Sequence, residues 1–113
     1  MIMQGDLLLV PFPFSDQSGR KVRPVVVVSN SKFNDYADDV IVVGITSNLS
    51  KSKYTLSLSN NELEEGKLFS LCHIKVENIL KLEKSLIIKK IGKLNRKKID
   101  EIKSLLDSIL NNS

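Results

Sequence analysis

The chain has 113 residues, a net charge of +4, one cysteine and one histidine. This length predicts a single domain, residues 1–113, with a core that needs no disulfide bridge, and the lone Cys72 and His73 exclude a zinc cluster of these residue types. No apolar stretch approaches the roughly 20 residues of a membrane helix, and the start lacks signal-peptide features, so we expect a cytoplasmic protein without membrane contact.

Short apolar runs in the first half of the chain predict β-strands. Residues 7–12 (LLLVPF), 24–29 (PVVVVS) and 38–47 (DDVIVVGITS) are rich in β-branched or aromatic residues and are bounded by turn formers. Residues 53–59 (KYTLSLS) alternate between larger apolar or aromatic and small polar side chains, which is typical of a half-buried strand.

The second half continues the pattern and then changes period. Residues 67–76 (KLFSLCHIKV) and 85–94 (SLIIKKIGKL) predict further strands, with 78–84 as a connector or strand. Short strands at this spacing predict a compact barrel or sandwich. Residues 95–112 carry apolar side chains at helical spacing behind a candidate N-cap, Asn95, and therefore predict a helix that packs on the sheet.

Basic residues concentrate between residues 81 and 98, where eight lysines and arginines face a single acid, Glu83. Arg96, Lys97 and Lys98 fall in the first turn of the predicted helix, where the helix dipole disfavours cations. This local conflict favours a functional use of the charge. A solvated surface and a nucleic-acid patch that includes Lys97 and Lys98 both remain open.

Few groups are suited to catalysis. The sequence has no phosphate-binding glycine loop, dinucleotide fingerprint or nucleophile elbow. We expect His73 to be a strand residue satisfied by one hydrogen bond, and the acids near residues 35–39 and 62–65 to be solvated turn residues rather than a magnesium site. If the strand ends at Arg23 and at residues 46–48 are neighbours, a guanidinium and hydroxyls converge on a pocket suited to a phosphate.

Four motifs carry a resemblance that spans nearly the whole chain: "GDLLLVPFPFSD", "RPVVVVSN", "DDVIVVGITS" and "LEKSLIIKKIGKL", followed by the terminal helix. In this order and spacing they resemble the MazF/PemK family of toxin endoribonucleases from toxin-antitoxin modules. The resemblance implies a mainly β fold, an SH3-like barrel of about six or seven short strands plus a C-terminal helix, usually as a homodimer.

The resemblance also implies a function. Such enzymes cut single-stranded RNA without a metal or cofactor by directing the ribose 2′-OH at the adjacent phosphate, which leaves a 2′,3′-cyclic phosphate and a 5′-hydroxyl. A small acidic antitoxin holds them inactive, and operator DNA is a further partner of the complex. The alternative is a non-catalytic nucleic-acid-binding or gyrase-targeting member of the same fold.

By position, the resemblance assigns catalytic roles to Arg23 and Thr46. Because an arginine side chain keeps its proton, we expect Arg23 to stabilise charge rather than act as a base. Relatives often carry a glutamate ahead of the arginine, and Asp16 and Gln17 are its nearest equivalents here. The expected substrate-binding residues lie in the loop before the second strand and after the third: Phe14, Asp16, Gln17, Lys21, Ser47 and Asn48.

Overall fold

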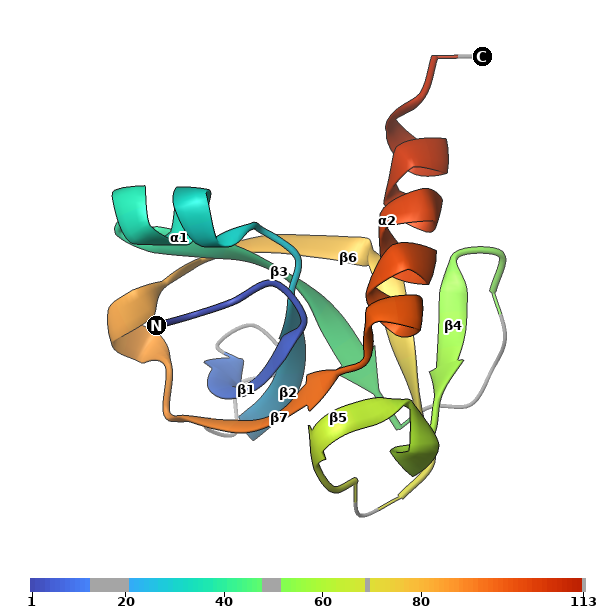
Figure 1. The fold of residues 1–113 in the computed structure, drawn as a ribbon, viewed down its shortest axis with the longest axis horizontal. Coiled ribbons are helices and arrows are strands. Elements are labelled where there is room, and N and C mark those ends of the chain that lie inside the picture. Colours follow the sequence, from blue (N-terminus) through green and yellow to red (C-terminus); the bar gives the residue numbers. More distant parts are fainter. Residues whose placement is uncertain (13–20, 48–51, 69, 113) are drawn as a thin grey trace.

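The computed structural model describes residues 1–12, 21–47, 52–68 and 70–112. Within these ranges, seven strands form one curled sheet in which every pairing is antiparallel (Figure 1). The sheet order is β4-β6-β3-β2-β1-β7-β5. The strands are β1 (Asp6–Phe12), β2 (Lys21–Val27), β3 (Asp39–Thr46), β4 (Thr55–Leu58), β5 (Leu63–Gly66), β6 (Cys72–Glu83) and β7 (Lys89–Leu94).

Two α-helices and two short 3₁₀ helices complete the described chain. They are α1 (Ser31–Tyr36), η1 (Asn60–Glu62), η2 (Lys84–Leu86) and α2 (Arg96–Leu110). The expected mainly β fold with a C-terminal helix is confirmed, and Asn95 caps α2 as expected, since its side chain accepts a hydrogen bond from the Lys98 N–H at 2.9 Å. The sheet is a half-barrel whose described edges are β4 and β5.

The structure decides or corrects the sequence-based expectations at three places. Residues 78–84, expected as a connector or strand, are strand as far as Glu83: they form the second half of β6, whose pairing with β3 shifts register between Val43 and Gly44 and then continues. Glu64 and Glu65, expected in a turn, lie in β5. The short helix α1 had no expected counterpart, because its apolar content is low; it begins where the Asn30 side chain accepts a hydrogen bond from the Phe33 N–H.

Each face of the sheet has its own apolar core. On the face covered by α2, core 1 consists of buried residues from six strands and the helix: Leu7, Val26, Val43, Ile45, Leu58, Cys72, Ile74, Val76, Leu94, Ile99 and Ile102. Core 2 lies on the opposite face and consists of Leu8, Val10, Val25, Val27, Val40 and Val42. Neighbouring residues of a strand alternate between the two cores, as the pleat requires.

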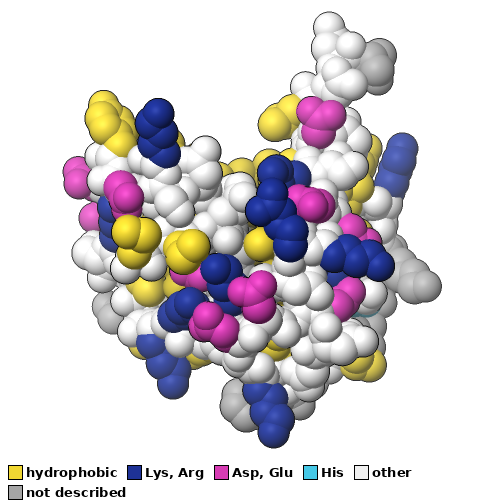
Figure 2. Space-filling model, viewed as in Figure 1, with side chains coloured by type: hydrophobic (Ala, Val, Ile, Leu, Met, Phe, Trp, Pro, Cys, Tyr) yellow, Lys and Arg dark blue, Asp and Glu magenta, His cyan; other side chains and the backbone are white. Residues whose placement is uncertain are grey.

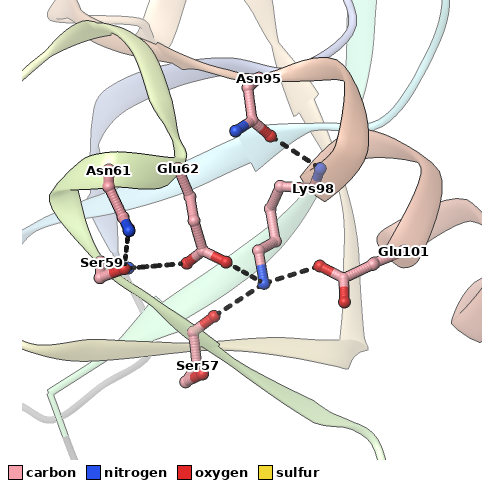
Figure 3. A network of polar contacts seen from close by, with 7 residues as sticks. All are labelled: Ser57, Ser59, Asn61, Glu62, Asn95, Lys98 and Glu101. Carbon is pink, nitrogen blue, oxygen red and sulfur yellow. Dashed lines mark hydrogen bonds and ion pairs between the residues drawn. The ribbon is translucent and has the colours of Figure 1, made fainter.

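The junction of α2 with the sheet is built around a buried lysine (Figure 3). The Lys98 side chain is 5% exposed, and its Nζ lies 2.8 Å from a carboxylate oxygen of Glu62 and 2.8 Å from one of Glu101. It also donates a hydrogen bond to the Ser57 carbonyl oxygen at 3.1 Å. For Lys98, neither of the two alternatives left open by the sequence, a solvated lysine or a lysine of a nucleic-acid patch, fits the structure, because this buried amine joins α2 to β4 and η1.

The first motif of the chain has a structural role at the same junction. Gly5 has a φ of 94°, and a Cβ there would lie 2.4 Å from Cδ1 of Ile99 in α2. A glycine permits both this backbone conformation and this close approach. Asp6 is buried, accepts a hydrogen bond from the Met3 N–H and pairs with Lys90, so it fixes the turn that leads into β1.

Candidate active site

The start of β2 and the end of β3 meet at one end of the sheet. Their pairing ends with Val25 opposite Gly44, and Arg23 and Thr46 lie two residues beyond this pair on the two strands. Both residues line one pocket. The structure thus brings together the two residues to which the resemblance assigns catalytic roles.

A pocket of about 590 Å³ opens at this end of the sheet. Its volume is within the range of roughly 300–1,000 Å³ that is usual for ligand sites. Arg23 and Thr46 are half-buried, and Ser47 beside them is exposed. The pocket is lined by these three residues and by Leu9, Val22, Pro24, Ile45, Lys67, Leu68, Ser70, Cys72, Lys89 and Ile91.

The pocket has a cationic rim and an apolar floor. Arg23, Lys67 and Lys89 are its charged lining residues, and no carboxylate lines it among the residues that the structure describes. Cys72 belongs to core 1, and burial raises the pKa of its thiol, so it contributes an apolar wall rather than a nucleophile. A concave site with positive charge and three hydroxyl groups, from Thr46, Ser47 and Ser70, suits a phosphodiester.

Several expected site residues cannot be placed. Phe14, Asp16, Gln17 and Asn48 lie outside the described residues. Lys21 is the first residue of β2, but its side chain is likewise outside the described part. Their substrate-binding roles stay predictions.

Lys67, Ser70 and Lys89 are pocket residues that the sequence did not single out. Lys89 lies within the basic run of residues 81–98, which is a weak signal. Lys67 and Ser70 come from the connection between β5 and β6, and no sequence pattern ties that connection to the start of β2.

Half of the eight basic residues of the run, Lys81, Lys90, Arg96 and Lys98, are paired with carboxylates of the described chain. Lys81 pairs with Asp39 at 3.6 Å, and Arg96 pairs with Asp100 at 3.4 Å. Lys90 lies 3.4 Å from Asp6 and 3.3 Å from Glu65; burial opposes its charge, but the two carboxylates outweigh burial and raise the pKa of Lys90.

On the face of the molecule drawn in Figure 2, basic and acidic side chains lie next to one another. A continuous nucleic-acid patch over residues 81–98 is therefore not supported by the structure, whereas Lys89 lies at the pocket. In the described part of the chain, no three His, Cys, Asp or Glu side chains are grouped so that they could hold a metal ion. None of the described helices has the length and apolar character needed to cross a membrane.

Solved structures with the same fold are toxins and their complexes. An endoribonuclease from a mycobacterial species in complex with its cognate antitoxin superposes with a TM-score of 0.80 at 16% sequence identity, covering 100% of both chains. A MazE-MazF structure from Deinococcus radiodurans gives a TM-score of 0.80 at 18% identity, covering 99% of this chain and 98% of the other. The fold is therefore the one found in MazF-type toxins.

Sequence relatives narrow this class to a family. The chain is 33% identical over 112 residues to the endoribonuclease MazF of Staphylococcus saprophyticus subsp. saprophyticus, covering 95% of this chain and 89% of the relative. It is 34% identical over 110 residues to the endoribonuclease MazF of Staphylococcus epidermidis, with the same coverage. Residues 3–110 match the family described as "PemK-like, MazF-like toxin of type II toxin-antitoxin system", and the chain belongs to this family.

Proposed function

We propose that this toxin is an endoribonuclease that cleaves single-stranded RNA through attack of the ribose 2′-OH on the adjacent phosphate. The observation that carries the proposal is that Arg23 and Thr46 line one cationic pocket. The names of the staphylococcal relatives, both endoribonucleases, support the same activity.

In the proposed reaction the pocket binds the scissile phosphate and stabilises its developing charge. The Arg23 guanidinium donates hydrogen bonds to the phosphate oxygens, and the Thr46 hydroxyl donates one more. Lys67 and Lys89 hold the phosphates on either side, because ammonium groups neutralise a nucleic-acid backbone without reading its bases. The products are a 2′,3′-cyclic phosphate and a 5′-hydroxyl.

We further propose that a cognate acidic antitoxin inhibits the toxin in the cytoplasm, that the complex binds operator DNA, and that the toxin is a homodimer. The antitoxin complexes among the structures with this fold support the first part. Exposed apolar side chains on both helices, such as Tyr36 and Leu110, support self-association. Sedimentation that gives only a monomer at micromolar concentration would contradict the dimer.

The experiment that tests the activity is incubation of the purified protein with a long single-stranded RNA in excess EDTA, followed by analysis of the product ends. Wild-type protein is expected to give discrete fragments with cyclic phosphate ends. Arg23→Ala should lose cleavage by several orders of magnitude and remain folded, and Arg23→Lys serves as the variant that keeps the charge but not the planar fork. RNA that stays intact but shifts in mobility would contradict the proposed nuclease activity and indicate a nucleic-acid-binding protein.

A further inference from the structure

One wall of the pocket, residues 67–68, is the chain that leaves β5. Lys67 and Leu68 both line the pocket, as does Ile91 of β7. Lys67 is exposed, whereas Leu68 is half-buried and packs against core 1. The pairing of β5 with β7 ends before this wall, with Gly66 opposite Gly92. Contacts outside the sheet ladder must therefore position the wall.

The side chain of Asn60 in η1 supplies such a contact. The Leu68 N–H donates a hydrogen bond to Asn60 Oδ1 at 2.6 Å, and Asn60 Nδ2 donates a longer one to the Leu68 carbonyl oxygen at 3.5 Å. One amide group thus contacts both backbone polar groups of one residue, as a residue of a neighbouring antiparallel strand can. Asn60 therefore extends the support of this chain two residues beyond the end of β5.

The turn that carries Asn60 is itself attached to α2. The Ser59 N–H donates a hydrogen bond to Glu62 Oε1 at 2.9 Å, which closes η1. Glu62 Oε2 lies 2.8 Å from the buried Lys98 amine (Figure 3). The N–H of Asn95, the N-cap of α2, donates to the Glu62 carbonyl oxygen at 2.8 Å. These contacts fix η1 against the foot of α2, so Asn60 extends from an ordered turn.

Resting on the proposed function, we infer that Asn60 is a positioning residue for RNA binding: its hydrogen bonds to Leu68 hold the pocket wall so that Lys67 contacts an RNA phosphate. Asn60 is not part of the pocket lining and acts through the backbone that it holds. Because the Lys67 ammonium ends a flexible stem, its position at a phosphate depends on a fixed backbone. Loss of the Asn60 side chain should weaken this contact and leave Arg23 and Thr46 in place.

The kinetic test compares Asn60→Ala with wild type and with Asn61→Ala. Asn61 is the next residue of η1 and is the matched control, because its side chain contacts Ser59 rather than the wall. Losing one such hydrogen bond should raise KM for RNA about two- to tenfold in Asn60→Ala and leave kcat unchanged. Asn60→Asp keeps an acceptor for the Leu68 N–H and should recover part of the loss at high salt, where its added charge is screened. A wild-type KM in Asn60→Ala would overturn the inference.

A second measurement distinguishes positioning of Lys67 from general loosening of the fold and does not depend on cleavage. Affinity for a single-stranded oligonucleotide of 2′-deoxyribose throughout, which the proposed chemistry cannot cut, is measured against salt for Asn60→Ala, Lys67→Ala and the double variant. Each single change should reduce the slope of log affinity against log salt by up to about 0.7, the contribution of one phosphate contact. The double variant should bind no more weakly than Lys67→Ala, because both changes remove the same contact.

Additive losses in this cycle, or Lys67→Ala that binds like wild type, would overturn the inference. If wild type binds RNA but never cuts it, the proposed function fails, while the binding cycle still decides the role of Asn60. Wild-type protein that binds no nucleic acid would overturn both.

Discussion

Truncation of the buried lysine at the foot of α2 should destabilise the protein far more than truncation of its neighbour. Lys98→Ala removes an amine that contacts two carboxylates and one backbone carbonyl. Lys97→Ala removes an exposed side chain from the same helical turn and is the matched control. Both changes replace a lysine by alanine, so their intrinsic helix propensities differ equally from wild type.

The magnitude follows from the burial of the amine and the exposure of its partners. Breaking a fully buried ion pair typically costs about 3–5 kcal/mol of unfolding free energy. The Glu62 and Glu101 side chains are 28% and 44% exposed, so water recovers part of their interaction once the amine is gone. We therefore expect about 2–3 kcal/mol for Lys98→Ala and less than about 0.5 kcal/mol for Lys97→Ala.

Urea unfolding followed by far-UV circular dichroism at pH 7 measures both values. With a slope of about 1–3 kcal/mol per molar urea, the midpoint of Lys98→Ala should fall by roughly 0.7–3 M. Equal midpoints for the two variants would refute the reasoning, because the network in Figure 3 would then contribute no more than a solvated lysine.

Three further outcomes follow from the same structure. Burial raises the pKa of Glu62, but the Lys98 amine and the Ser59 N–H outweigh burial and lower this pKa overall from 4.5. The ionised Glu62 therefore stabilises the folded protein above that pH, and this stabilisation is lost in more acidic solution. The difference in unfolding free energy between wild type and Lys98→Ala should accordingly narrow below pH 4.5 in urea titrations. Gly5→Ala should cost about 2 kcal/mol of unfolding free energy because of its positive φ and the close Ile99 methyl, and adding Ile99→Val should recover part of the contact in a double-mutant cycle; full additivity would contradict the contact. Replacing both Lys67 and Lys89 by alanine should reduce the slope of log affinity for RNA against log salt by about 0.7 per lost phosphate contact, and an unchanged slope would remove these lysines from the binding surface.

Much of the fold could be predicted because its signals are local. The valine-rich run of β2 predicts a strand and the apolar stripe of α2 predicts a helix. The Asn95 cap follows from the position of Asn95 directly before the stripe. Arg23 and Thr46 could be singled out because Arg23 precedes Pro24 at the start of an apolar strand and Thr46 stands at the end of another.

The rest depends on pairings between distant segments. Lys98 looked like a surface cation because its partner Glu62 lies in another element, and no periodicity joins η1 to α2. Lys67 lines the pocket from the connection between β5 and β6, far along the chain from Arg23 and Thr46. The register that sets His73 opposite Thr46 is fixed by a bulged pairing of β3 with β6, which the sequence does not reveal.

The most direct test of the account is one RNA whose mapped cleavage site carries a single 2′-deoxyribose at the attacking position, compared with the unmodified RNA in EDTA. The account predicts that cleavage at the modified site disappears while neighbouring sites are still cut to cyclic phosphate ends. Cleavage that persists at the 2′-deoxy position would contradict attack by the 2′-OH and, with it, the proposed role of the pocket at Arg23 and Thr46.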